Sequence, residues 1–428
     1  MNINYLSLPT SMITKVPKIH PSKDILSSKS RLLEGRKVAL GICGSVAAVK
    51  SPEIARELMR HGADVWALMT ESAQRLITPQ LMEWATGNPV VTELTGKIEH
   101  VSLGRGPPGG ADLILIAPAT ANTVGKMASG IDDTTVTSLA TTAIGAGVPI
   151  VLVPAMHGSM YQHPIVSENL KKLASLGIKI VEPQIIEEKA KIADTDAIVE
   201  AVIATLGKRD LKSKRVLVTA GPTRSYMDAI RYLTNSSSGK MGFAFAKEAL
   251  ARGASVTVIT GPTSAPPPTS NTIRVGTTEE MLDAVKSELQ TKNYDLLVMA
   301  AAPLDFAVAE KSNEKLPSES PLTIKLVPLP KIIGEARRLS KRLFIIGFKA
   351  EYGLPPEEFM SRARKRLMDS GMNLIVANDL SRSDTGFGVD TDEVYVLDAK
   401  GLVAHIPLSS KREIARKVLD IFAERRKG

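Results

Sequence analysis

The sequence has little cysteine and no long apolar run. Cys43 is the one cysteine among 428 residues, so the chain cannot form an internal disulfide, and a zinc site built from several cysteines is excluded. No apolar run reaches the ~18 residues that a membrane-spanning helix needs. Residues 1–34 are polar and lack the apolar segment of a signal peptide. We therefore expect a cytoplasmic protein without membrane segments, in which residues 1–34 form an N-terminal arm or, alternatively, a disordered tail.

Aromatic residues are also scarce, at 4%, although 43% of the residues are hydrophobic. The core is then built from Val, Ile, Leu, Met and Ala, a composition typical of buried parallel strands covered by helices. The net charge of +9 raises the question of nucleic-acid binding. However, Lys and Arg are scattered along the chain, and no basic stripe interleaved with aromatic residues is present. We expect the excess charge to serve small anionic substrates such as phosphates, with no nucleic acid as a partner.

A pattern of strand, tight turn, helix and strand occurs twice. In it, Ala55-Arg-Glu-Leu-Met-Arg-His-Gly-Ala-Asp-Val65 resembles Ala246-Lys-Glu-Ala-Leu-Ala-Arg-Gly-Ala-Ser-Val256. The alternation of apolar strands with helical spacing predicts an α/β fold with two Rossmann-like domains, each a mainly parallel sheet flanked by helices. The strands are expected at residues 38–42, 65–69, 111–117, 149–154, 215–220, 255–260, 296–301, 343–348 and 374–377.

The length allows two or three domains of about 150 residues each. A polar, basic stretch at residues 207–213 separates a predicted helix from a predicted strand and is the expected boundary. Residues 263–271 and 311–321 are expected to be loops within the second domain, because the α/β alternation continues beyond them. The predicted organisation is an arm at residues 1–34, a first domain at residues 35–208 and a second domain at residues 209–428.

Three motifs of small residues follow predicted strands in the first domain: Gly41-Ile-Cys-Gly-Ser45, Ala117-Pro-Ala-Thr-Ala-Asn-Thr123 and Val153-Pro-Ala-Met-His-Gly-Ser-Met-Tyr161. Open α/β sheets bind ligands beyond the carboxyl ends of their strands, and a helix N-terminus after a glycine turn favours phosphate. By itself the first motif is equally compatible with a purely structural turn. Similarly, His100 alone would be an ordinary polar residue, and Asn122 alone a helix N-cap.

Taken together with Glu99-His100-Val101-x-Leu103, these motifs resemble those of the homo-oligomeric flavin-containing cysteine decarboxylases. The resemblance implies that FMN is the cofactor, that His100 assists oxidation and decarboxylation, and that Asn122 holds the substrate carboxylate. In that chemistry FMN oxidises the substrate thiol, so that a thiocarbonyl accepts the electrons released with CO2. The FMN-binding residues implied by the resemblance are Gly44, Ser45, Thr70, Ser72, Thr120 and Met156.

The first domain departs from this family at two places. His157 stands where the family's Pro-x-Met-Asn motif has asparagine, and residues 182–192 hold no counterpart of the flap cysteine that many members use as a proton donor. Cys43 lies in the phosphate turn and is a poor substitute. Lys189, Lys191 and His157 are the candidates for the missing donor. The archaeal-type fused enzymes look like this sequence at both places.

The second domain contains a Ser- and Gly-rich run, Asn235-Ser-Ser-Ser-Gly-Lys-Met-Gly242, directly before a predicted helix. Its hydroxyls and free amides would form an anion-binding nest with the helix dipole behind it. The spacing is not that of a Walker A loop. For residues 236–239 alone, a Ser-rich capped loop would be the simpler interpretation.

The longer run that starts at Asp228 resembles the phosphopantothenate–cysteine ligase domain. Three later segments resemble it too, namely Met299-Ala-Ala-Ala-Pro-Leu-Asp-Phe306, Ile346-Gly-Phe-Lys-Ala-Glu351 and Val376-Ala-Asn-Asp379 followed by Gly386-Phe-Gly388. The motifs follow the order of the fused enzymes over residues 35–405. The resemblance implies that CTP converts a carboxylate into an acyl-cytidylate, which the amine of cysteine then attacks. Mg2+ is expected with CTP, its ligands are unidentified, and ATP is the less favoured nucleotide.

Within this resemblance, Lys315 stabilises charge while the cytidylate forms, and Asn235 binds the acyl intermediate. This chain lacks basic residues of the bacterial forms at two places: their lysine cluster reads Lys315-Leu-Pro-Ser318 here, and their second late-helix basic position falls on Ser370. Lys349 is the candidate for the replacement charge. The implied nucleotide-binding residues are Gly221, Ser238, Gly239, Lys240, Ala301, Asp305, Lys315, Phe348, Lys349 and Arg366.

The prediction is therefore a bifunctional enzyme of coenzyme A biosynthesis that uses 4′-phosphopantothenate, cysteine and CTP. Because active sites in these families form between subunits, we expect a homo-oligomer, with a trimeric decarboxylase core and dimeric ligase domains that together give a dodecamer. One alternative is a flavin-binding regulatory protein, which would predict loss of His100 or a long acidic tail. Another is an enzyme similar to flavin prenyltransferases, which leaves the second domain unexplained.

Overall fold

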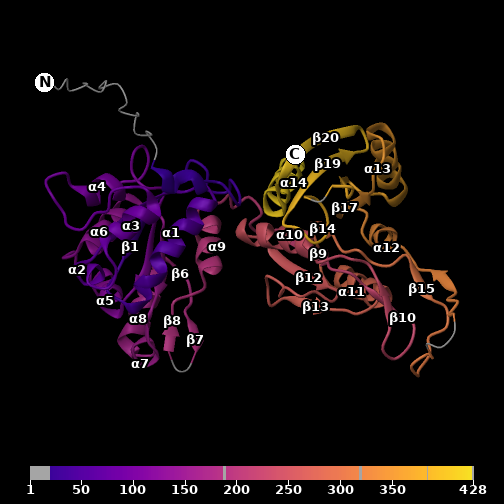
Figure 1. Ribbon diagram of the computed structural model, residues 1–428, viewed down its shortest axis with the longest axis horizontal. Coiled ribbons are helices and arrows are strands. Elements are labelled where there is room, and N and C mark those ends of the chain that lie inside the picture. Colours follow the sequence, from indigo (N-terminus) through magenta and orange to yellow (C-terminus); the bar gives the residue numbers. More distant parts are fainter. Residues whose placement is uncertain (1–19, 187–188, 318–320, 383, 427–428) are drawn as a thin grey trace, which may run out of the picture. The chain divides into compact units, whose positions relative to one another are not determined.

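The computed structural model describes residues 20–186, 189–317, 321–382 and 384–426, with the backbone alone at residues 185, 186, 189 and 190. The chain forms two compact units, Met1–Val202 and Ile203–Gly428. Each unit is built on a main sheet that is wholly or mainly parallel and is packed against helices (Figure 1). The predicted α/β class is confirmed. The predicted boundary between residues 208 and 209 stays a prediction.

The first unit has a parallel sheet with the strand order β2-β1-β3-β4-β6, in which the order reverses between β1 and β3. The strands are β1 (Lys37–Ile42), β2 (Asp64–Met69), β3 (Leu113–Ala119), β4 (Ile150–Pro154) and β6 (Lys179–Ile180), and a small antiparallel sheet contains β5 (Met156–His157), β8 (Lys189–Lys191) and β7 (Gln184–Ile186). The helices are η1 (Pro21–Ile25), η2 (Val46–Lys50), α1 (Ser51–Arg60), α2 (Glu71–Gln74), α3 (Pro79–Thr86), α4 (Glu99–Gly104), α5 (Ala121–Ser129), α6 (Thr135–Ala146), α7 (Gly158–Tyr161), α8 (Pro164–Ser175) and α9 (Thr195–Leu206).

The strands of this sheet are continuous apolar runs because helices cover them. All seven residues of β3 are buried, and helices α4, α5, α6 and α8 contribute to the same core cluster. The helix predicted after β1 begins as the 3-10 turn η2. In that turn Val46 is 77% exposed and Val49 is 60% exposed, so these two valines do not face the core.

The second unit has an eight-stranded sheet with the order β13-β12-β9-β14-β17-β18-β19-β20, parallel up to β18. The strands are β9 (Arg215–Ala220), β12 (Ser255–Thr260), β13 (Thr272–Arg274), β14 (Leu296–Met299), β17 (Phe344–Glu351), β18 (Leu374–Asp379), β19 (Thr391–Asp398) and β20 (Gly401–Ser410), and two separate hairpins comprise β10 (Arg224–Tyr226) with β11 (Tyr232–Thr234) and β15 (Phe306–Val308) with β16 (Leu326–Pro328). The helices are α10 (Lys240–Ala251), α11 (Thr278–Thr291), α12 (Ile332–Leu339), α13 (Pro356–Ser370) and α14 (Lys411–Arg425).

Alternation along the strands divides the core of this unit into two layers. Val216 and Val218 of β9 pack toward α10 and α14, whereas Leu217 between them packs toward α11, α12 and α13. The strand order reverses between β9 and β14, as in the dinucleotide-binding form of the doubly wound sheet. The similar segments 55–65 and 246–256 become α1–β2 and α10–β12, which have corresponding places in the two sheets.

The sequence did not predict the antiparallel edge strands β19 and β20 or the two hairpins. The first hairpin is inserted between β9 and α10. The Ser- and Gly-rich run therefore follows this hairpin rather than β9 directly, and it leads into the start of α10. Of the helices within the described ranges, none is long and apolar enough to cross a membrane.

The contact of α10 with β9 yields a test of the packing. A Cβ atom at Gly242 would lie 2.7 Å from the Ala220 Cβ and 2.8 Å from the Thr219 carbonyl oxygen. Gly242→Ala is therefore expected to lower the free energy of unfolding of the second unit by about 1–3 kcal/mol, because overpacking forces α10 off the strand. Urea denaturation of the whole chain measures the change.

The matched control is Gly334→Ala in α12, where an added Cβ meets no atom within 4 Å. Since alanine is a better helix residue than glycine, this change is expected to be neutral or to stabilise by about 0.5–1 kcal/mol. Equal effects of the two substitutions would contradict the close helix–strand contact at Gly242.

Candidate functional site

A pocket in the first unit opens beyond the carboxyl ends of β1, β3 and β4, next to the reversal of strand order. It brings together Asn122 and all six residues that were predicted to bind FMN. Its lining consists of Cys43, Gly44, Ser45, Thr70, Ser72, Thr120, Ala121, Asn122, Thr123, Lys126, Thr134, Thr137, Ala155, Met156 and Met160.

Four hydroxyl side chains of this lining cap helices that start at the same edge of the sheet. The caps are Ser45 for η2, Thr70 for α2, Thr120 for α5 and Thr134 for α6. Asn122 is consequently not the N-cap of α5, because the Thr120 hydroxyl accepts the Thr123 N–H at 3.2 Å. The hydroxyls of Ser45 and Thr70, at the starts of η2 and α2, provide hydrogen-bond donors for phosphate oxygens.

The inner wall of the pocket fits a ligand that approaches the backbone closely. A Cβ at Gly44 would lie 2.4 Å from the Ser72 Cβ, so a larger residue would displace this wall. The Cys43 sulfur accepts the Thr123 hydroxyl at 3.2 Å, and burial raises the pKa of the Cys43 thiol to about 11. Such a thiol stays protonated near neutral pH and is a weak acid. The glycine-permitted approach and the hydroxyl-rich lining fit FMN.

Lys126 of α5, one helical turn after Asn122, contributes a positive charge to the lining of this pocket. The Lys126 Nζ contacts both carboxylate oxygens of Asp133, at 2.9 and 2.7 Å, and this contact lowers the pKa of Asp133. The pair is therefore close to neutral as a whole, and the pocket combines an uncharged amide, hydroxyls and one compensated cation.

His100 does not contribute to this lining. It belongs to α4, and its Nδ1 is buried with no hydrogen-bond partner among the described residues. Of the candidate proton donors, His157 accepts the Ser159 N–H at 3.4 Å with its Nδ1 and caps α7, which is a role that asparagine also fills. Lys191 is exposed, and the side chain of Lys189 lies outside the described residues. Neither His157 nor Lys191 lines the pocket.

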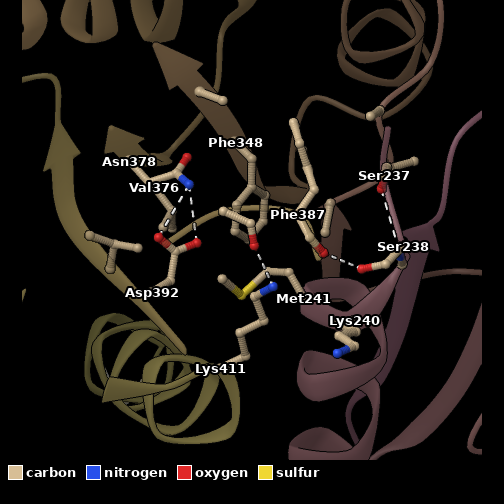
Figure 2. Close-up of a pocket in the computed structure, with 17 residues that line it drawn as sticks. Ser237, Ser238, Lys240, Met241, Phe348, Val376, Asn378, Phe387, Asp392 and Lys411 are labelled. Atoms are coloured by element: carbon tan, nitrogen blue, oxygen red, sulfur yellow. Dashed lines mark hydrogen bonds between the residues drawn. The ribbon is translucent and has the colours of Figure 1, made fainter. Parts of the chain in front are cut away.

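The second pocket lies beyond the carboxyl ends of β14, β17 and β18, beside the start of α10 (Figure 2). Five residues from the predicted nucleotide set line it, namely Ser238, Gly239, Lys240, Ala301 and Phe348. Gly239 has a φ of +79° and leaves α10 without a side-chain cap, so the first amides of the helix stay available. The remaining lining is Ser237, Met241, Ala300, Ala302, Ala350, Val376, Asn378, Gly386, Phe387, Asp392, Val394 and Lys411.

Two other predicted residues lie beside this pocket without lining it. Gly221 is next to the nest, because a Cβ at Gly239 would lie 3.3 Å from the Gly221 nitrogen. The Asn235 amide donates to the carbonyl oxygens of Ala302 and Pro303, at 3.0 and 3.3 Å. Asn235 therefore ties the Ser- and Gly-rich run to the segment after β14.

Four predicted residues are not brought to the pocket. Lys349 projects from the face of β17 opposite to Phe348, because strand side chains alternate, and it pairs with Glu351 at 3.2 Å. Arg366 lies on α13, which packs in the opposite core layer. Asp305 is exposed and pairs with Lys331 at 2.5 Å, and Lys315 is exposed on its loop.

Sequence reasoning missed the polar floor of the second pocket. Asp392 is 2% exposed and Lys411 is 5% exposed, and the Asn378 amide donates to the Asp392 carboxylate at 3.0 Å. Burial raises the pKa of Asp392 and lowers the pKa of Lys411. The one available signal was Lys411 at the first position of a helix, where the dipole disfavours a cation.

Comparisons with known proteins cover nearly the whole chain. The Flavoprotein family model matches residues 26–207, and the model of the DNA/pantothenate metabolism flavoprotein C-terminal domain matches residues 211–425. The coenzyme A biosynthesis bifunctional protein CoaBC of Thermococcus kodakarensis is 51% identical over 402 residues, which cover 94% of this chain and 98% of that protein. The chain belongs to the CoaBC family.

Other CoaBC proteins match over a similar length. The protein of Methanocaldococcus jannaschii is 39% identical over 96% of this chain and 98% of its own length. The protein of Escherichia coli strain K12 is 35% identical over 92% of this chain and 98% of its own length. The identity is thus higher with these two archaeal relatives than with the bacterial one, as the departures in the motifs led us to expect.

In this member of the CoaBC family, Asp228 ties the Lys315 loop to the first hairpin. The buried carboxylate accepts the Arg231 N–H at 2.6 Å, the Ile230 N–H at 2.8 Å and the Leu316 N–H at 3.1 Å. It also receives the Arg231 guanidinium at 2.7 Å. The hydrogen bonds, that of the Arg231 backbone first, hold the pKa of Asp228 well below its usual range. Asp228 therefore fixes the residue next to Lys315.

Replacing this carboxylate by its neutral isostere tests whether Asp228 positions Lys315. In Asp228→Asn we expect kcat/KM for ligation to fall about ten- to hundredfold, because a buried donor set loses its charged acceptor. Decarboxylation of added 4′-phosphopantothenoylcysteine should be unchanged. The exposed Asp283 of α11 gives the control, Asp283→Asn.

A carboxyl whose folded pKa is depressed stabilises the fold above its unfolded pKa and loses that contribution as pH falls through the folded pKa. The ratio of wild-type to Asp228→Asn activity should therefore stay constant between about pH 6 and 9, far above the ordinary carboxyl range. A ratio that changes across this window would contradict the assignment.

Proposed function

We propose that this member of the CoaBC family catalyses two consecutive steps of coenzyme A biosynthesis. Residues 209–428 ligate cysteine to 4′-phosphopantothenate with CTP, and residues 35–208 decarboxylate the resulting 4′-phosphopantothenoylcysteine to 4′-phosphopantetheine. One observation carries the proposal. The chain is similar to CoaBC proteins over almost its full length, and each of its two units has a pocket at its strand reversal, hydroxyl-rich in the first unit and Ser- and Gly-rich in the second. The cytoplasm is the proposed location.

For the decarboxylation, FMN supplies a transient oxidation of the substrate thiol when it is bound. Gly44, Ser45 and Ser72 hold the phosphate end, and Thr120 lies toward the ring. The Asn122 amide donates to the substrate carboxylate. Since this amide is uncharged, it orients the carboxylate without the strong ground-state stabilisation that an unpaired cation would give, which favours loss of CO2.

The catalytic role of His100 requires a second copy of the chain. His100 is absent from the pocket of its own unit, and its buried Nδ1 has no partner among the described residues. The first unit also exposes large apolar side chains that a neighbouring copy would cover, including Val46, Val49 and Ile98. A trimer of first units would place His100 at the pocket of the neighbouring copy.

The second unit carries its own association surface. The β10–β11 and β15–β16 hairpins contact one another. They expose apolar side chains: Ile230 is 63% exposed, Phe306 51% and Leu326 45%. Such projecting apolar hairpins suit a two-fold interface in which each copy presents the same surface. Dimers of the second unit combined with trimers of the first give a dodecamer.

For the ligation, a carboxylate is a poor acyl donor because oxide is a poor leaving group. Conversion to an acyl-cytidylate releases pyrophosphate and leaves CMP as the leaving group for the attack of cysteine. The amides and hydroxyls at the start of α10 bind the nucleotide phosphates, and Phe348 offers an aromatic face within the same pocket. Lys315 stabilises the charge that develops during transfer, and Asn235 holds the acyl group.

Mg2+ accompanies CTP in this proposal. Within the described residues, no group of three or more His, Cys, Asp or Glu side chains is placed to hold a metal ion. Mg2+ commonly binds through substrate phosphates and waters with one or two carboxylates, so CTP itself would supply most of its ligands in this proposal. CTP is the proposed nucleotide and ATP the less favoured one.

Two substitutions separate the activities. His100→Asn is expected to lower CO2 release at least about a hundredfold, since general acid–base residues contribute that much, while pyrophosphate release is kept. Lys315→Ala is expected to do the reverse, with pyrophosphate release lowered at least about a hundredfold and decarboxylation of added 4′-phosphopantothenoylcysteine kept. Coupled assays of pyrophosphate and of CO2 measure both.

Lys311→Ala is the matched control for the second substitution. Lys311 is an exposed lysine at the start of the same loop, 5.3 Å from the centre of the Tyr226 ring, and its loss should leave both activities near the wild-type level. Pyrophosphate release that is unaltered in Lys315→Ala would remove the ligase assignment.

A further inference from the structure

Four consecutive carbonyl groups, those of residues 386–389, each accept a side-chain hydrogen bond in the second pocket. We call residues 386–389 the rim loop. The Lys411 Nζ donates to the Gly386 and Val389 oxygens, at 2.6 Å each. The Ser238 hydroxyl donates to the Phe387 oxygen, and the Lys240 Nζ donates to the Gly388 oxygen at 3.0 Å. The rim loop is thus fixed by side chains rather than by a strand ladder. Figure 2 shows Ser238 and Lys411 beside it.

Two of these donors belong to the proposed phosphate site. Ser238 and Lys240 stand at the start of α10, where the nucleotide phosphates bind in the proposed function. A phosphate that takes these two donors removes them from the oxygens of Phe387 and Gly388. After that exchange, Lys411 is the donor that still holds both ends of the rim loop.

Lys411 and its surroundings are suited to such an anchor. The Lys411 ammonium donates a hydrogen bond to the Gly386 oxygen, and an interaction of the Asp392 carboxylate with the Gly386 backbone offsets part of the effect of burial on the pKa of Asp392. The Asn378 amide holds the Asp392 carboxylate at 3.0 Å. Gly386 is therefore held at its carbonyl group by Lys411 and interacts with Asp392, a second buried side chain of opposite charge.

A lysine at the position of Lys411 is unfavourable for the stability of the fold. A buried cation loses hydration, and an apolar residue of similar size in place of a buried charge pair is often neutral or stabilising. Lys411 is also the first residue of α14, where the helix dipole opposes a positive charge. The acidic Glu413 in the same turn follows the usual preference. These costs indicate that Lys411 serves the pocket rather than the fold.

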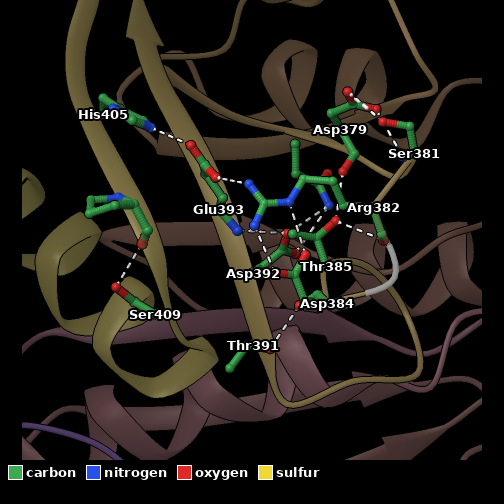
Figure 3. A network of polar contacts seen from close by, with 12 residues as sticks. Asp379, Ser381, Arg382, Asp384, Thr385, Thr391, Asp392, Glu393, His405 and Ser409 are labelled. Carbon is green, nitrogen blue, oxygen red and sulfur yellow. Dashed lines mark hydrogen bonds and ion pairs between the residues drawn. The ribbon is translucent and has the colours of Figure 1, made fainter.

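The flanks of the rim loop are held independently of Lys411. Arg382 pairs with Asp384 at 2.7 Å and with Glu393 at 2.8 Å, and the Thr385 hydroxyl donates to the Asp379 oxygen at 2.8 Å (Figure 3). Removal of the Lys411 ammonium should consequently loosen the rim loop and leave its flanks in place.

We propose that Lys411, together with Asp392, is a positioning residue for the ligase. When CTP binds, Ser238 and Lys240 donate to its phosphates instead of to the rim loop, and Lys411 keeps the rim loop in place as a wall of the nucleotide pocket. The proposal rests on the proposed ligase function of this pocket. Lys411 also supplies a cation at the pocket where the sequence had suggested Lys349, which projects from the other face of β17.

The test compares Lys411→Met, Lys411→Arg and Asp392→Asn with the wild-type protein in the full chain. Lys417→Met on the exposed side of α14 is the matched control. For Lys411→Met we expect the KM for CTP to rise about tenfold while kcat changes less than about threefold, because the loss affects binding of the nucleotide. The melting temperature and the decarboxylation rate should match those of the wild type.

Hydrogen exchange gives a readout that does not depend on activity. With CTP bound, the amides of the rim loop should exchange at least about tenfold faster in Lys411→Met than in the wild type, while those of α14 are unchanged. Asp392→Asn should show a smaller change in the same direction. Lys411→Arg keeps a charged donor and should restore part of both effects.

The outcomes are decisive in either direction. An unchanged KM with unchanged exchange would overturn the proposal. A fall in kcat at constant KM would show that Lys411 acts on the reacting groups and would overturn the positioning role. A lowered melting temperature with loss of both activities would assign Lys411 to the fold. If the wild-type protein releases no pyrophosphate with CTP, the proposed function fails, and exchange measured without nucleotide still decides whether Lys411 anchors the rim loop.

Discussion

The reversal of strand order within each parallel sheet is the constraint on which both pockets depend. Neighbouring connections leave toward opposite faces of the sheet at the reversal, so the loops after those strands diverge and leave a crevice. In the first unit this occurs between β1 and β3, and in the second between β9 and β14. Two small residues, Gly44 after β1 and Gly239 at the start of α10, let the crevices extend to the backbone.

Much of this arrangement could be predicted from the sequence. Buried strands such as β3 and β14 are recognisable as uninterrupted apolar runs. The six residues predicted to bind FMN follow the strands β1 to β4, so all six meet in one pocket. The edge strands β19 and β20 could not be predicted in the same way, because only part of each is buried. The hairpins escaped prediction because their apolar residues are exposed within one copy, as at Ile230.

The second pocket shows the limit of prediction from motifs. Lys349 lies in a motif, but the alternation of β17 directs it away from Phe348 and the pocket. Lys411 lies in no motif, and only the packing of α14 against the sheet brings it under the rim loop. His100 is a different case. Its motif is recognisable in the sequence, but its side chain does not line the pocket of its own unit. The geometry between elements that are distant in the sequence, rather than local sequence, sets the positions of Lys349 and Lys411.

The central claim is that one chain performs ligation and decarboxylation in sequence. The most direct measurement follows pyrophosphate and CO2 in a single reaction of the wild-type protein with 4′-phosphopantothenate, cysteine, CTP and Mg2+. The account predicts a yellow protein that releases pyrophosphate first and then CO2, in equal final amounts. CO2 released without pyrophosphate, or a colourless protein that releases pyrophosphate but no CO2 after FMN is added, would contradict it.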